Sequence, residues 1–274
     1  MNSQSKSFLI WLIAFFLTFT LAVFQRITGP TYEIHGKIAI GKDLIKYKLI
    51  RTYDGADGAL ISIKIPDTAI KGKITYQRFK SNDPWTVEPM QRTGNQLSGR
   101  LSHQPPTGKV AYQVTLAKDN QQYILNPEPA VLRYKSPIPK YVLLPHIVFI
   151  FLAMLFSVRT GFEAIFRSNK TYVYTWWTVI TLFIGGLVFG PIVQKLSFGA
   201  YWTGWPFGHD LTDNKSIVAF IFWIIALWAL HKNRENKFWP ILASVILFIV
   251  FLIPHSLLGS EIDYSKQPQT EQTK

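Results

Sequence analysis

The distribution of apolar residues constrains this chain more than any other feature, because these residues gather in five separate runs. The first run extends from Phe8 to Phe24 and contains no charged residue. A helix that crosses a bilayer needs about 17–25 mainly apolar residues, whereas the apolar core of a cleaved signal peptide has roughly 7–15. We therefore interpret residues 1–25 as an uncleaved signal anchor that spans the membrane.

Four further apolar runs follow a long polar block. They are Tyr141–Val158, Tyr172–Val193, Ile217–Leu230 and Phe238–Ile253. The last two runs are short for a full span and reach adequate length only if their flanking polar residues lie at the interface. The sequence therefore predicts a membrane α-helical bundle of five spans in total, four of them within residues 141–255.

Basic residues in the short connections predict the orientation of these spans. They precede the first run and fill two connections: Lys6; Arg159, Arg167 and Lys170; and Lys232, Arg234 and Lys237. Short loops rich in Lys and Arg remain in the cytoplasm. We therefore expect a multi-pass protein of the cell membrane with a cytoplasmic N-terminus. Residues 26–140 and the C-terminus are then extracytoplasmic, which means periplasmic if the membrane is a Gram-negative inner membrane.

The polar block of residues 26–140 is typical of an all-β domain. Four of its segments alternate apolar and polar residues with a period of two: Lys37–Ile40, Leu60–Ile65, Lys73–Phe79 and Val110–Leu116. This alternation indicates half-buried strands, and Gly-, Pro- and Asn-rich turn signals separate the segments. Short strands at such spacing predict a β-sandwich.

One strand and two proline-rich stretches extend this interpretation. The stretch Gly108–Val114 resembles a late strand of an immunoglobulin-like or fibronectin-type sandwich, and that resemblance implies a binding or scaffolding role. Asn126–Pro129 and Ser136–Pro139 are expected to form a stiff tether into the second span. Residues 256–274 are expected to form a flexible tail.

Charge and cysteine content limit the classes of function. The chain has a net charge of +13, and residues 26–140 carry 18 Lys and Arg against 9 Asp and Glu. Such a basic domain suits anionic lipid headgroups, an acidic polymer or an acidic protein. Nucleic acid is not expected as a partner outside the cytoplasm. The chain has no cysteine, which excludes disulfides, thiolate metal sites and thiol catalysis.

Ionisable residues near the predicted outer membrane face form the candidate metal site. They are His146, His209, Asp210, Asp213 and His255. Ionisable groups at membrane depth often mark function, and a Zn²⁺ ion needs about four nitrogen or oxygen ligands. A histidine pair is also able to ligate haem. The alternative is that these side chains hydrogen-bond headgroups or loop carbonyls, and that Thr212 or Asp213 simply caps the fourth span.

The loop of residues 194–215 alternates glycines with large aromatic residues. Tyr201, Trp202 and Trp205 are expected either to cover a cavity between the helices or to form an aromatic belt at the interface. Two functions remain open. The first is a binding or scaffolding subunit of the cell envelope, which contacts envelope protein partners through residues 26–140. The second is a metal- or haem-dependent membrane enzyme or redox subunit with its site at the outer face.

Overall fold

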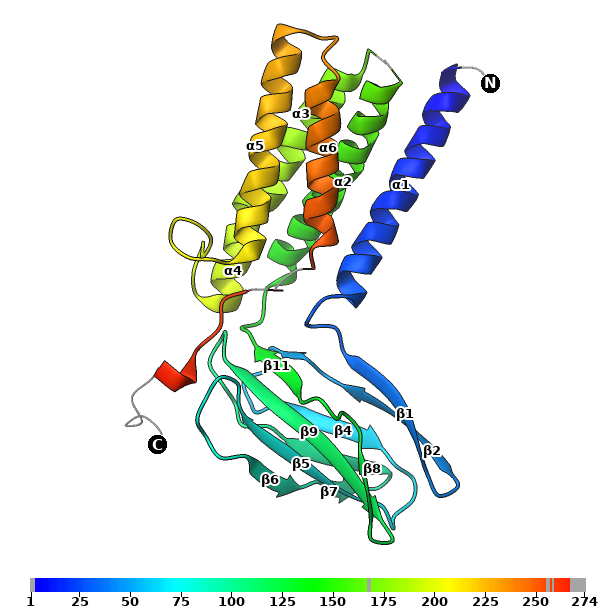
Figure 1. The fold of residues 1–274 in the computed structure, drawn as a ribbon, viewed down its shortest axis with the longest axis vertical. Helices are drawn as coiled ribbons and strands as arrows, with labels where there is room; N and C mark the ends of the chain where they lie inside the picture. The colour runs from blue at the N-terminus through cyan, green and yellow to red at the C-terminus, as the bar shows by residue number, and fades with distance from the viewer. Residues whose placement is uncertain (1–2, 167–168, 255–256, 258, 267–274) are drawn as a thin grey trace. The chain divides into compact units, whose positions relative to one another are not determined.

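The computed structural model describes residues 3–166, 169–254, 257 and 259–266. The chain divides into two compact units (Figure 1). The helical unit comprises Met1–Pro30 and Ile138–Ser260, and the β unit comprises Thr31–Pro137 and Glu261–Lys274. The chain therefore passes between the units three times, and its C-terminal segment belongs to the β unit.

The helical unit consists of long apolar helices. They are α1 (Ser3–Ile27), α2 (Lys140–Ile165), α3 (Thr171–Leu182), the π-helical segment η1 (Phe183–Phe189), α4 (Gly190–Phe198), α5 (Leu211–Lys232) and α6 (Phe238–Leu252). The elements α3, η1 and α4 follow one another without a break and form one long helix, Thr171–Phe198. Four helices are long and apolar enough to cross a membrane: Gln4–Ile27, Lys140–Ile165, Thr171–Phe198 and Leu211–Lys232. Four of the five predicted spans are thus confirmed by length and composition. With 15 residues, α6 is about 22 Å long.

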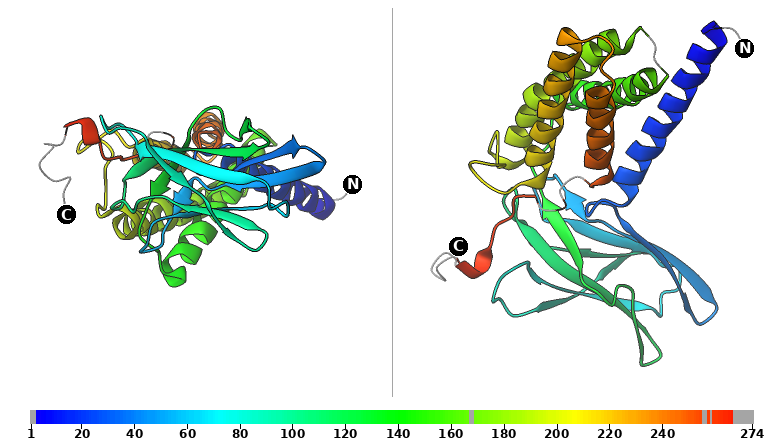
Figure 2. Two further views of the ribbon diagram at one scale, coloured as in Figure 1. Left: turned by 90° about the horizontal axis from the view of Figure 1, so that it is seen from below. Right: turned by 45° about the horizontal axis from the view of Figure 1, so that its top comes forward.

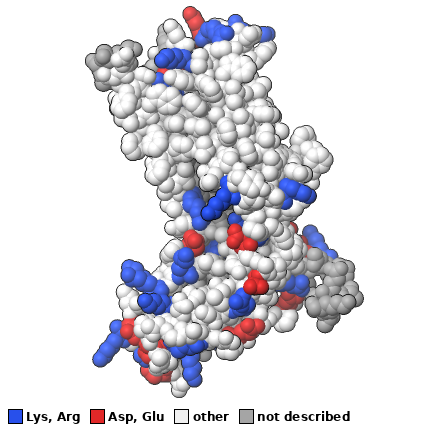
Figure 3. Space-filling view, turned by 180° about the vertical axis from the view of Figure 1, so that it is seen from behind, with Lys and Arg blue, Asp and Glu red and all other residues white. Residues whose placement is uncertain are grey.

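Small residues let the helices pack closely inside the unit. The helix α2 contacts α1, α3 and α6 (Figures 1 and 2). The interior contains Trp223 of α5 together with alanines of α2, α5 and α6. Large apolar side chains cover the outside instead, as with Phe8, which is 65% exposed. Figure 3 shows uncharged residues along the length of the helices on one face. Such a surface suits hydrocarbon rather than water.

Gly185 of η1 lies directly against the backbone of α2. A Cβ at this position would lie 2.9 Å from the amide nitrogen of Ile150 and 3.0 Å from the carbonyl carbon of Phe149. At Gly186 the nearest atom would be 3.6 Å away, which is ordinary van der Waals contact. Close packing at this point therefore requires glycine at position 185. Gly185 lies within the π-helical segment η1, and π-helical turns are frequent at functional sites.

The β unit contains two sheets and a separate hairpin. The hairpin is β1 (Ile34–Ile40) and β2 (Asp43–Leu49). The larger sheet has the order β3-β11-β9-β5-β6, with β10 also paired to β9: β3 (Thr52–Tyr53), β11 (Ala130–Tyr134), β9 (Lys109–Lys118), β5 (Lys71–Arg78), β6 (Thr86–Pro89) and β10 (Gln121–Ile124). The smaller sheet has the order β4-β8-β7: β4 (Leu60–Lys64), β8 (Gln96–Arg100) and β7 (Gln91–Thr93). All pairings are antiparallel except β3 with β11.

Apolar side chains from both sheets and the hairpin form one core. Ile63 of β4, Ile74 of β5 and Ile45 of β2 all belong to it. The sheets approach closely where Gly99 of β8 faces β5, since a Cβ there would lie 3.0 Å from Cγ2 of Ile74. The four predicted strand segments match strands to within one residue at their ends, so the all-β character of this block is confirmed. Its immunoglobulin-like or fibronectin-type class is not confirmed.

The first half of the predicted tether, Asn126–Pro129, is the connection between β10 and β11 and is hydrogen-bonded to the larger sheet. Asn126 is buried, accepts a hydrogen bond from the amide of Val114 (3.0 Å) and donates to the carbonyl of Tyr112 (2.9 Å). Its side chain thus joins the segment before β11 to the middle of β9. The sequence predicts a free tether here, whereas the structure holds this segment against β9. The Asn126 side chain makes the hydrogen bonds to β9 that the neighbouring prolines, which have no amide hydrogen, are unable to make. Only Ser136–Pro139 remains as a connection into α2.

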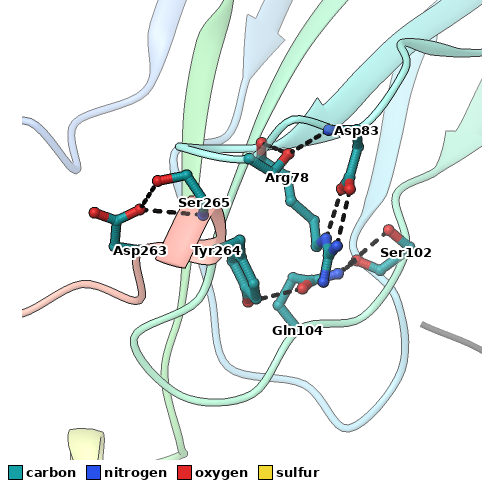
Figure 4. Close-up of polar contacts among 8 residues, drawn as sticks. Arg78, Asp83, Ser102, Gln104, Asp263, Tyr264 and Ser265 are labelled. Carbon is teal, nitrogen blue, oxygen red and sulfur yellow. Dashed lines mark hydrogen bonds and ion pairs between the residues drawn. The ribbon is translucent and has the colours of Figure 1, made fainter. Parts of the chain in front are cut away.

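A C-terminal segment of the chain, Glu261–Lys266, packs on the β unit (Figure 4). Tyr264 is buried and donates a hydrogen bond to Oε1 of Gln104 (2.8 Å), while the Arg78 guanidinium lies 4.5 Å from its ring centroid. The Glu261 carboxylate accepts hydrogen bonds from Lys109 and Lys80. Partial burial alone would raise the pKa of Glu261, but these two lysines outweigh it and lower the pKa. Residues 261–266 of the predicted flexible tail are therefore attached to the domain.

The contrast between Gly185 and Gly186 gives a matched test of helix packing. Gly185→Ala forces a methyl group against the backbone of α2, and such overpacking costs about 1–3 kcal/mol. We expect a lower thermal unfolding midpoint for this variant in detergent. Gly186→Ala has room for the methyl group and gains helix propensity, so its midpoint is expected to stay equal or rise. Equal midpoints for the two variants would contradict the packing described here.

Candidate functional site

The segment between α4 and α5 folds around the carboxylate of Asp213. This side chain is buried near the start of α5 and accepts hydrogen bonds from the amides of Thr203 (2.7 Å) and Gly204 (3.0 Å). A Cβ on Gly204 would lie 2.6 Å from Cβ of Asp213, so only glycine permits this approach. The side-chain oxygen of Asn214 accepts a further hydrogen bond from the amide of Trp205 (2.7 Å). Asp213 and Asn214, in the first turn of α5, thereby accept hydrogen bonds from the backbone amides of the preceding loop, which is not helical.

Asp210 has a second structural role in the same loop. Its Oδ1 accepts a hydrogen bond from the amide of Thr212 (2.8 Å), which makes Asp210 the N-cap of α5. Its Oδ2 accepts bonds from the amide of Ser260 (3.2 Å) and the hydroxyl of Thr203 (3.3 Å). The sequence predicts Thr212 or Asp213 as the cap, and this is wrong because α5 begins at Leu211, six residues before the apolar run that starts at Ile217.

The residues predicted to hold a metal have different surroundings. Asp210 and Asp213 both contact Thr203, whereas Nδ1 of His146 lies 2.9 Å from the carbonyl oxygen of Gly185 on another helix. His209 is exposed, and His255 lies outside the described residues. In the described part of the chain, no three His, Asp or Glu side chains are grouped closely enough to hold a metal ion. The five-residue metal or haem site therefore stays a prediction.

The aromatic residues of the loop are mainly exposed. Trp205 and Tyr201 have exposed fractions of 75% and 60%. Trp202 is half-buried and donates from Nε1 to the carbonyl of Trp205 (3.1 Å), while Lys195 lies 5.5 Å from the ring centroid of Tyr201. This placement is typical of rings at a membrane interface.

A buried ion pair in α2 was missed by the sequence reasoning. Arg159 and Glu163 lie one helical turn apart, are bonded to each other, and are exposed by only 1% and 3%. The guanidinium lies 5.3 Å from the Trp11 ring of α1 and 5.2 Å from the Tyr174 ring of α3, and it donates to Oγ of Ser7 (3.1 Å). The sequence places Arg159 in a cytoplasmic connection, because the apolar run ends at Val158. The helix α2 continues beyond that run to Ile165, which puts Arg159 one turn from Glu163. That i,i+4 spacing is the signal that was available in the sequence.

The outer face of the β1–β2 hairpin carries four basic side chains in two facing pairs. His35 lies opposite Lys48, and Lys37 lies opposite Lys46. All four are exposed, while the other face of the hairpin buries Ile40, Ile45 and Leu49. Side chains directly opposite one another have Cβ atoms about 4.5–5.5 Å apart, and like charges in such pairs are destabilising. In the described residues, none of these four side chains forms an ion pair with a carboxylate.

Comparisons of the chain with protein-family models, with curated proteins and with solved structures found no match in any of the three.

Replacement of Asp213 tests whether its carboxylate holds the α4–α5 loop. Asp213→Ala leaves the amides of Thr203 and Gly204 without an acceptor, and each unpaired buried donor costs about 1–3 kcal/mol. We expect hydrogen exchange of residues 199–210 to accelerate by about tenfold or more. His209→Ala changes an exposed neighbour in the same loop and is expected to leave exchange unaltered. Slow exchange retained in Asp213→Ala would show that other contacts order the loop.

Proposed function

We propose that this protein is a multi-pass membrane protein of the cell envelope that binds an anionic partner through its extracytoplasmic β unit. In this proposal α6 is the fifth span and the β unit is an immunoglobulin-like binding module. The observation that carries the proposal is the hairpin face, defined by His35, Lys37, Lys46 and Lys48. A partner that supplies carboxylates relieves the repulsion between the facing Lys37 and Lys46, so binding is coupled to the loss of that repulsion.

The orientation rests on the charges at one end of the helical unit. The start of α1, the α2–α3 turn and the α5–α6 turn lie at the same end (Figure 1). That end carries Lys6, Lys170, Lys232, Arg234 and Lys237. Short segments rich in Lys and Arg remain in the cytoplasm, which supports a cytoplasmic N-terminus and an extracytoplasmic β unit.

The strand pairing favours a partner protein with an extended acidic segment. The hairpin is a two-stranded sheet in which β1 pairs only with β2 within the described chain. The outer edge of β1 therefore presents backbone groups to which a further strand is able to add. Side chains repeat every second residue on one face of a strand. A segment with acidic residues at alternate positions would thus place them beside His35 and Lys37.

Charge reversal on the hairpin separates binding from stability. Lys37→Glu creates an opposite-charge pair with Lys46, which is expected to stabilise the β unit by roughly 0.2–1 kcal/mol. The same substitution is expected to weaken binding of a peptide with alternating Glu and Thr by about tenfold or more. Both effects are measured on the full chain in bilayer nanodiscs, by thermal unfolding and by fluorescence anisotropy with the labelled peptide.

A matched control distinguishes the hairpin from bulk charge. Lys71→Glu changes the net charge equally at an exposed position on β5. This control is expected to leave peptide affinity within about twofold of the parent value. Equal losses of affinity in Lys37→Glu and Lys71→Glu would contradict a site on the hairpin, and so would undiminished binding in Lys37→Glu.

A further inference from the structure

A pocket of about 610 Å³ lies between α1 and α2 at the basic end of the helical unit. Its polar lining comprises Lys6, Ser7, Arg159, Glu163 and Lys170. Its apolar lining is Leu9, Ile10, Ile13, Phe162 and Phe166. The pocket thus has a charged part and a hydrocarbon part within one helical unit, and it has no connection with the hairpin face.

Two residues that line the pocket carry buried polar atoms with no hydrogen-bond partner among the described residues. Within the described part of the chain, Nε and Nη1 of the Arg159 guanidinium have no hydrogen-bond partner, and neither has Oε2 of Glu163. Buried charged groups are nearly always fully hydrogen-bonded, because each missing bond to a charged group is costly. At membrane depth that requirement is more severe, since hydrocarbon supplies neither donors nor acceptors. The two free donors of Arg159 therefore point to an acceptor that comes from outside the chain.

The balance of charge around the pocket indicates the sign of the ligand. Three cationic side chains, Lys6, Arg159 and Lys170, contribute to the wall, against one carboxylate, Glu163. Arg159 is also fixed in direction by the Trp11 and Tyr174 rings and by Ser7. A planar guanidinium held in place matches the oxygen atoms of a phosphate group particularly well.

We propose that the α1–α2 pocket binds the phosphate group of an amphiphile, with Arg159 and Lys6 on the phosphate and the apolar part along Leu9, Ile13 and Phe162. The two sources of such a group are an anionic phospholipid of the surrounding bilayer and a soluble phosphate ester. The apolar lining favours the phospholipid, because a soluble ester leaves that part of the wall uncovered.

Two substitutions with opposite expected effects test this site. Lys6→Gln removes one exposed cation near the start of α1 and is expected to weaken phosphatidylglycerol binding by about fivefold. Glu163→Gln removes the one carboxylate among the described residues that line the pocket and is expected to strengthen binding, by about threefold or more. Lys232→Gln is the control, because Lys232 lies at the same end of the bundle on the Trp228 ring, outside the pocket.

The measurement is native mass spectrometry of the full chain in detergent, titrated separately with phosphatidylglycerol, phosphatidylcholine and glycerol 1-phosphate. Saturable binding of phosphatidylglycerol above phosphatidylcholine, with opposite shifts in Lys6→Gln and Glu163→Gln, supports a lipid site. The same opposite shifts with glycerol 1-phosphate at equal affinity support the phosphate site and assign it to soluble esters.

Three outcomes would overturn the proposal. They are no preference for anionic phosphatidylglycerol or glycerol 1-phosphate over zwitterionic phosphatidylcholine, a loss in Lys232→Gln as large as that in Lys6→Gln, and weaker binding in Glu163→Gln. Arg159→Gln does not carry the test, because Arg159 also packs against the Trp11 ring of α1 and the Tyr174 ring of α3. Its replacement changes helix packing as well as the pocket. Lys6→Gln and Glu163→Gln carry the test, since Lys6 is exposed and the glutamine at position 163 keeps the size of the side chain.

Discussion

The absence of hydrogen-bonding partners in hydrocarbon is the constraint on which the helical unit depends. The backbone N–H and C=O groups of the long helices bond to one another within each helix. The backbone between the helices has no such regular pattern and needs other hydrogen-bond partners. Between α4 and α5, Asp213 accepts the amides of Thr203 and Gly204, and Asp210 caps the next helix. Carboxylates that resemble metal ligands in the sequence are therefore needed for the loop itself.

Electrostatic pairing differs sharply between parts of the β unit. Lys80 and Lys109 share the carboxylate of Glu261, and Lys118 pairs with Asp67 at 2.7 Å. The lysines of the hairpin face, by contrast, oppose further basic side chains across the strands. Within the described residues, the Lys37–Lys46 pair keeps like charges opposite one another, at a cost in stability. Under the proposed function, an acidic partner turns this repulsion into attraction in the complex.

Periodicity made the main elements predictable from sequence. The apolar runs located the helices, and the alternation in Lys73–Phe79 and Val110–Leu116 located β5 and β9. Contacts between residues distant in the chain were not predictable in the same way. The attachment of Tyr264 to Gln104 and Arg78 joins segments more than 150 residues apart, and no local pattern encodes it. The Arg159–Glu163 pair was local, but it was hidden because its residues lie beyond the end of an apolar run.

The hairpin face and the basic helix ends must lie on opposite sides of a membrane if the proposed function is correct. The chain has no cysteine, so single cysteines introduced by Lys42→Cys in the hairpin turn and Glu235→Cys in the α5–α6 turn are its only thiols. The decisive measurement is their labelling by a membrane-impermeant maleimide on intact cells. We predict that the hairpin cysteine is labelled directly and that the α5–α6 cysteine is labelled only after the membrane is permeabilised. The reverse pattern, or equal labelling of both positions before permeabilisation, would contradict an extracytoplasmic binding unit.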